Sequence, residues 1–122
     1  MSDQTISFVR SMVGRFPGLC GPLEEHIEAN FGEVLPHVFF GDVTRYVVSL
    51  LLATRSSACL PPRRELRDIL SYLEEAYAAG DEALRELISV SFLENLPRPG
   101  ERGAEVRRMI GPNLRRQLEL IG

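Results

Sequence analysis

Several residue types that would point to a particular chemistry are scarce or missing in this sequence. It contains no tryptophan and no lysine, so all 14 basic residues are arginines. Its only two cysteines, Cys20 and Cys59, fall in no CxxC or Cys/His spacing. Because that spacing offers neither a disulfide framework nor a zinc site, we expect both cysteines to be reduced and mostly buried.

Long apolar runs are also missing. The most apolar stretch, residues 43–53, is interrupted by Arg45 and covers about eleven residues, whereas a membrane span needs roughly 20. The opening residues, MSDQTISFVRS, include an early aspartate and lack the apolar run typical of a signal peptide. We therefore expect a cytoplasmic protein with one domain over residues 1–122, an ordinary single-domain length.

The hydrophobic spacing predicts an all-α fold, a compact bundle of about seven helices. Its centre is expected to be a buried helix over about residues 42–54, because Val43 and Val47 begin an apolar stripe that covers most of the helix surface. Gly41 is expected to break the chain direction before this helix. Asp42 is then placed to cap its N-terminus, unless it belongs to a binding surface instead.

The second predicted helix begins near Pro22, with Ile27 and Phe31 facing inward. Its outer face and the following segment are acidic, and no basic residue occurs between Arg15 and Arg45. Such a surface disfavours nucleic acid, whose phosphates need arginine or lysine, and favours a basic protein partner. The acidic residues of this block are Glu24, Glu25, Glu28, Glu33 and Asp42.

A helical hairpin is predicted over about residues 62–96. Pro62 suits its first helical position, and Gly80-Asp81 leaves room only for two helices folded back on each other, with Asp81 capping the second. Residues 98–103, RPGERG, are rich in glycine and proline and are expected to form a flexible loop.

Two aromatic residues and a histidine precede the central helix. Successive residues on a helix point about 100° apart, so Phe39 and Phe40 are either both buried between neighbouring helices, or Phe40 is partly exposed as an anchor beside the acidic residues. His37 is either a partly buried histidine beside these rings or a contact residue.

No residue pattern indicates a metal, cofactor or catalytic site. Glu33 and His37 could share a helix face, but there is only one acidic helix and no Glu-x-x-His motif, so we expect no metal. Ser89 and Ser91 lie within a helix without a glycine elbow, so we expect no enzyme activity and no cofactor. The arginine pairs of the second half are interleaved with acidic residues and lack aromatic residues to stack a base, so nucleic-acid binding is not expected.

Three strings resemble a family of small bacterial all-helical domains of unknown function. They are LPHVFFGD at residues 35–42, VSFLENL at residues 90–96, and Gly111-Pro112 followed by Leu114. Such domains resemble immunity proteins of polymorphic, Rhs-type toxin systems. The resemblance implies a protein that binds a cognate toxin domain with a basic cleft and neutralises it sterically through its acidic face. The residues expected on that face are Glu24, Glu25, Glu28, Glu33, His37, Phe40 and Asp42.

A second interpretation is a non-enzymatic helical adaptor or regulator. The last predicted helix carries a stripe of Leu114, Leu118 and Ile121, which could pack on the core, bind a peptide or form a homodimer. We therefore expect a monomer or a weak homodimer.

Overall fold

The computed structural model describes residues 3–56, 60–80 and 82–121, and every regular element in these ranges is helical. Two short 3-10 segments occur, η1 (Pro17–Leu19) and η2 (Leu93–Asn95). The seven α-helices of the described ranges are α1 (Asp3–Arg15), α2 (Cys20–Ala29), α3 (Pro36–Ser56), α4 (Leu60–Ala79), α5 (Glu82–Ser91), α6 (Val106–Met109) and α7 (Pro112–Ile121). The predicted all-α fold is confirmed.

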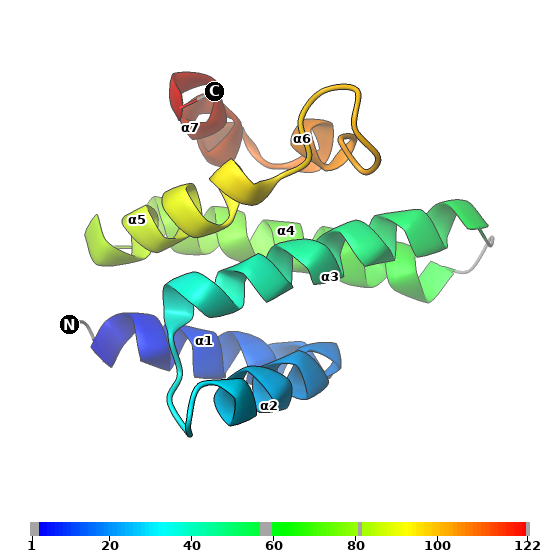
Figure 1. Ribbon diagram of the computed structural model, residues 1–122. Helices are drawn as coiled ribbons and strands as arrows, with labels where there is room; N and C mark the ends of the chain where they lie inside the picture. Colours follow the sequence, from blue (N-terminus) through cyan, green and yellow to red (C-terminus); the bar gives the residue numbers. More distant parts are fainter. Residues whose placement is uncertain (1–2, 57–59, 81, 122) are drawn as a thin grey trace.

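Helix α3 lies at the centre of the molecule, between α1 and α2 on one side and α5 and α6 on the other (Figure 1). Helix α4 packs along it, and α7 packs on α4 and α5. The stripe that begins with Val43 and Val47 is buried, as predicted. No helix in the described ranges, α3 included, is long and apolar enough to cross a membrane.

Helix α3 begins at Pro36 and runs without a break through Gly41 and Asp42. The predicted break and the predicted Asp42 cap are therefore wrong. A glycine inside a helix costs about 1 kcal/mol, whereas burying each of the two phenyl rings just before it contributes roughly 1.5 to 3 kcal/mol. The carboxylate of Asp42 instead forms an ion pair with Arg45, one turn further along α3.

Phe39 and Phe40 are both fully buried although they are consecutive. The Phe40 ring stacks on Phe8 of α1 with 6.2 Å between centroids, and the Phe39 ring lies 5.5 Å from the His26 ring of α2. Because several helices surround α3, directions about 100° apart both lead into the core. Phe40 offers no surface to a partner, so its predicted role as a contact residue is wrong for this fold.

Two helices begin at other residues than the sequence predicts. Helix α2 begins at Cys20 rather than near Pro22, because η1 leads directly into it, and α4 begins two residues before Pro62. Cys20 is exposed, so the expectation of a buried thiol is wrong at this position. Cys59 and Asp81, the predicted cap of α5, lie outside the described residues.

The second arm of the hairpin is shorter than predicted. Helix α5 ends at Ser91, and η2 replaces the expected last turn. Leu96 has extended backbone angles, as the residue before a proline prefers. The side-chain amide of Asn95 donates to the backbone oxygen of Ser91 at 2.7 Å and so satisfies a carbonyl at the helix end.

Glu74 of α4 fixes the start of α7. Its carboxylate accepts hydrogen bonds from the backbone nitrogens of Asn113 (3.0 Å) and Leu114 (3.1 Å) and from the Asn113 side-chain amide (2.8 Å). A Cβ atom on Gly111 would lie 2.5 Å from the Glu74 carboxyl carbon, so a glycine is needed for this approach. The carboxylate supplies the capping that the first turn of α7 requires.

Candidate protein-binding surface

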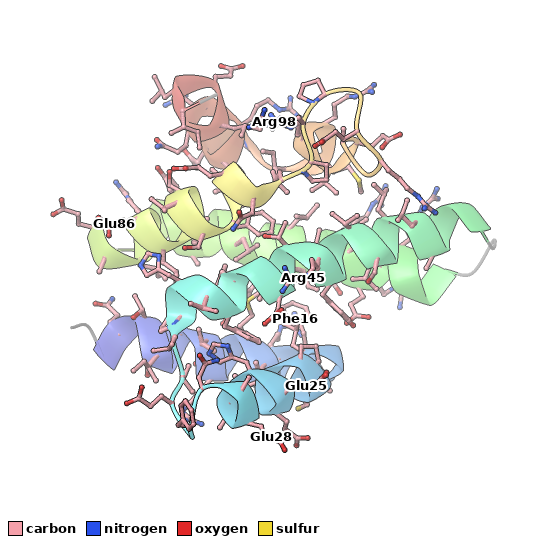
Figure 2. All side chains as sticks on the ribbon, viewed as in Figure 1. Phe16, Glu25, Glu28, Arg45, Glu86 and Arg98 are labelled. Carbon is pink, nitrogen blue, oxygen red and sulfur yellow. The ribbon has the colours of Figure 1, made fainter. Side chains whose placement is uncertain are left out.

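Helix α2 presents its acidic side chains to solvent. Glu24, Glu25 and Glu28 are exposed, and so is Glu33 in the turn that follows the helix. Figure 2 shows Glu25 and Glu28 on α2, at the opposite end of the molecule from α7. No arginine lies in α2 or in this turn. We call Glu24, Glu25, Glu28 and Glu33 the acidic surface.

The inner side of α2 holds the turn in place through His26. This histidine is buried, and its Nε2 accepts a hydrogen bond from the backbone nitrogen of Leu35 at 2.9 Å. The Asn30 side-chain amide donates to the backbone oxygen of His26 at 2.7 Å. Two polar contacts of a buried residue therefore fix the path from α2 to α3.

Phe31 stands at the tip of this turn and is 99% exposed, more than any other large apolar side chain in the described ranges. Its φ angle of 56° is left-handed, and Gly32 follows with a φ of 87°. The backbone nitrogen of Gly32 donates to the oxygen of Ile27 at 2.8 Å and closes the turn. The prediction that Phe31 faces inward with Ile27 is wrong, because α2 ends at Ala29 before the helical repeat reaches it.

The backbone conformation of Phe31 is costly. A left-handed conformation costs a non-glycine residue roughly 1 to 2 kcal/mol. Within the described residues, Phe31 is the only non-glycine with a positive φ. Folding gains no burial in return, since the ring is in solvent. Residues with such a strained backbone cluster at functional sites.

A groove of about 530 Å³ lies between α2 and α3, next to the acidic surface. Glu25 lines it from α2, and Asp42 and Arg45 line it from α3. Val38 also lines the groove and is 56% exposed. Asp42 thus lines the same groove as Glu25 of the acidic surface, but Arg45 neutralises part of its charge.

His37 is turned toward another part of the molecule. It is exposed, but its Nδ1 lies 2.6 Å from the Oγ of Ser91 on α5. Ser91 is only 4% exposed, and in the part of the chain that the structure describes no carboxylate bonds to this pair. The contact joins α3 to α5, and His37 does not line the groove between α2 and α3.

Tyr46 also lines the groove. Its hydroxyl donates to Oε2 of Glu65 on α4 at 2.5 Å. Burial raises the pKa of Tyr46 well above its ordinary value, and the hydrogen bond and charge of Glu65 raise it further. A Cβ atom on Gly18 would lie 2.0 Å from the Tyr46 hydroxyl, so η1 closes over this contact. Tyr46 therefore ties η1, α3 and α4 together.

The described residues hold no group of three or more histidine, cysteine, aspartate or glutamate side chains arranged to bind a metal ion. The sequence model of a family described as a domain of unknown function (DUF7674) matches residues 9–120. The chain belongs to this family. Its matched residues include the acidic surface, Phe31 and the groove. No curated protein and no solved structure matches the chain.

Sequence reasoning predicted the exposed glutamates of α2, and it allowed for an exposed aromatic anchor beside them. It placed that anchor at Phe40, which is buried, whereas the exposed phenylalanine is Phe31. The available signal was Asn30-Phe31-Gly32, because asparagine and glycine commonly occupy the ends of helices. Ending α2 there would have placed Phe31 in the turn.

Proposed function

We propose that this protein is a non-enzymatic binding domain that uses the acidic surface and Phe31 to hold a basic protein partner. In keeping with the sequence resemblance, the partner is a cognate bacterial toxin domain, and the protein is its immunity protein. The observation that carries the proposal is the full exposure of Phe31 in a left-handed conformation. Inhibition would follow from covering the basic cleft of the toxin.

Phe31 has the properties of an interface anchor. Removing a phenylalanine side chain from water contributes roughly 1.5 to 3 kcal/mol, and each 1.4 kcal/mol is a tenfold change in affinity. The hydrogen-bonded turn fixes its backbone before binding, so little ordering entropy is lost there. Aromatic anchors surrounded by polar residues are the usual arrangement of a binding hot spot.

The acidic surface supplies specificity and speed of association. Neither α2 nor the turn carries an arginine, and Arg45, which lines the groove beside Glu25, is paired with Asp42, so the four glutamates keep a net negative field. A partner with a positively charged cleft is attracted over about a Debye length, and salt weakens that attraction. The groove between α2 and α3 adds a recess, with the exposed Val38 on its edge, for a partner side chain.

The alternative function, a helical adaptor, would rely on a smaller exposed apolar surface. Leu114 and Leu118, the main part of the stripe that it relies on, are buried in the protein's own core. Leu120 and Ile121 are exposed at the end of α7. Two neighbouring side chains are a small apolar area compared with the patches that mark stable interfaces.

Co-purification with the toxin domain encoded beside the gene tests the proposal. We expect a complex at micromolar concentrations. Changing Glu24, Glu25 and Glu28 together to arginine should slow association by roughly tenfold or more at low salt. The same reversal at Glu82 and Glu86 of α5 is the control, since these exposed residues lie outside the acidic surface. A failure to form any complex would contradict the proposed function.

A further inference from the structure

The end of the molecule opposite the acidic surface is basic. Six of the 14 arginines lie between residues 98 and 116, where only Glu101 and Glu105 are acidic. This segment, with α6 and α7, lies across α3 from α1 and α2 (Figure 1). In the sequence these arginines resemble ordinary solvated side chains. The structure brings two of them to the same hollow.

The hollow has a volume of about 460 Å³ and combines an apolar wall with two guanidinium groups. Pro99 and Ile121 form the exposed apolar part of the wall, and the buried Leu93 of η2 and Leu118 of α7 also line it. Arg98 and Arg107 line the polar side, together with the exposed Glu94. Figure 2 shows Arg98 between α7 and the segment that leads to α6.

Both arginines are held by hydrogen bonds to or from the backbone. Nε of Arg107 donates to the backbone oxygen of Pro97 at 2.5 Å, which leaves its two terminal NH₂ groups for a ligand. The backbone nitrogen of Arg98 donates to Oε1 of Glu101 at 2.6 Å, and the nitrogen of Glu101 donates to the oxygen of Arg98 at 2.8 Å. In the described ranges neither guanidinium group is paired with a carboxylate.

The segment that carries Arg98 is fastened to the core. Gly103, at its end, is buried and has a φ of 90°. A Cβ atom there would lie 2.7 Å from Cγ1 of Val48 on α3, so the backbone packs directly against this side chain. Residues 98–103, expected as a flexible loop, form a closed hydrogen-bonded turn seated on α3. The backbone of Arg98 and the guanidinium group of Arg107 are thus positioned before any ligand arrives.

We propose that this hollow binds a singly charged oxyanion, a carboxylate or a phosphodiester, attached to an apolar body. Guanidinium groups recognise such oxygens through paired, charge-assisted hydrogen bonds. The exposed Pro99 and Ile121, which line the hollow together with the buried Leu93 and Leu118, receive the apolar part. Glu94 repels additional negative charge and so disfavours a dianion such as a phosphate monoester. The site is separate from the acidic surface and does not depend on the proposed toxin binding.

The test uses the full chain and three small probes followed by isothermal calorimetry and NMR. Benzoate represents a carboxylate, dibutyl phosphate represents a phosphodiester, and benzamide is the neutral match of benzoate. We expect saturable binding of benzoate or dibutyl phosphate and none of benzamide. Tighter binding of benzoate would identify the ligand group as a carboxylate, and tighter binding of dibutyl phosphate would identify it as a phosphodiester. Perturbed NMR signals should map to η2, the turn at 98–103 and α7.

Variants locate the site. Arg98→Gln and Arg107→Gln should each weaken anion binding by roughly tenfold, the loss expected for a charge-assisted hydrogen bond. Glu94→Gln should tighten it, because a repelling carboxylate is removed. Arg116→Gln is the matched control, since this exposed arginine of α7 does not line the hollow.

Three results would overturn the site: no saturable binding of either anion, equal binding of benzamide, or equal losses in Arg98→Gln and the Arg116→Gln control. Circular dichroism checks that each variant is folded. Arg107→Gln could fail to fold because its bond to Pro97 is lost. In that case the other two variants test the site, because Arg98→Gln should weaken anion binding and Glu94→Gln should tighten it.

Discussion

Phe31 combines a strained backbone with a side chain that contributes no burial to the fold, and replacing it with glycine should stabilise the protein while weakening its binding. Glycine adopts a φ of 56° without the roughly 1 to 2 kcal/mol penalty of other residues. Against this, the unfolded chain gains roughly 0.4 to 1 kcal/mol of conformational entropy. The ring is 99% exposed, so no buried area is lost.

The expected net change for Phe31→Gly is a gain of about 0.5 to 1 kcal/mol in the free energy of unfolding. For a domain of this length that raises Tm by about 2 to 5 °C. Urea unfolding followed by circular dichroism measures it. Phe31→Ala is the control: alanine keeps the Cβ atom and the strain, so its stability should match wild type, while its partner affinity should fall as much as in Phe31→Gly.

Two results would refute this reasoning. A loss of more than about 1 kcal/mol in Phe31→Gly would mean that the ring contributes to folding, because an exposed residue in the left-handed region should not destabilise when replaced by glycine. A stabilised Phe31→Gly that binds its partner as tightly as wild type would mean that the ring is not the anchor.

Three further changes probe the fold. Glu74→Ala removes the carboxylate that caps α7 and should cost about 1 to 3 kcal/mol in urea unfolding. Val47→Ala opens a cavity in the fully buried centre of α3 and should cost about 1 to 3 kcal/mol, measured in the same way. Burial raises the pKa of Tyr46, so above about pH 10 the unfolded chain loses its tyrosine proton first and stability falls. Tyr46→Phe should therefore make the loss of stability from pH 9 to pH 11 smaller.

Each of these changes has a matched control or a contradicting result. Glu75→Ala, at an exposed neighbour on α4, should leave stability within about 0.5 kcal/mol of wild type. If Val47→Ala lowers the free energy of unfolding by no more than about 0.5 kcal/mol, the centre of α3 is not tightly packed. The Tyr46 argument fails if the wild type and Tyr46→Phe lose stability in parallel above pH 10. Burial also raises the pKa of Tyr72, so part of the alkaline loss should persist in Tyr46→Phe.

The parts of the fold that follow local periodicity were predictable from the sequence. The apolar stripe of Val43 and Val47 indicated the central helix, and the glutamates of α2 indicated a solvent-facing side. The break at Gly41 was a local inference that tertiary packing overrode, because the burial of Phe39 and Phe40 favours one continuous helix. Local propensity is a weak guide where both ends of a segment are anchored in the core.

The features that carry the proposals depend on contacts between distant residues or on turn geometry. Glu74 reaches the start of α7 across about 40 positions, and no periodicity indicates such a pairing. Arg98 and Arg107 face one hollow only because the intervening turn closes on α3. Phe31 is exposed because α2 stops two residues before it, and helix ends are the least predictable boundaries.

The most direct test of the central claim is the dissociation rate of the cognate toxin domain, measured by biolayer interferometry. Phe31→Ala should increase this rate by roughly tenfold or more, the effect of losing one buried aromatic anchor. Leu120→Ala, which removes an exposed leucine from the far end of the molecule, should leave it unchanged. If the two variants release the toxin domain at the same rate as wild type, Phe31 and the surface around it are not the binding site.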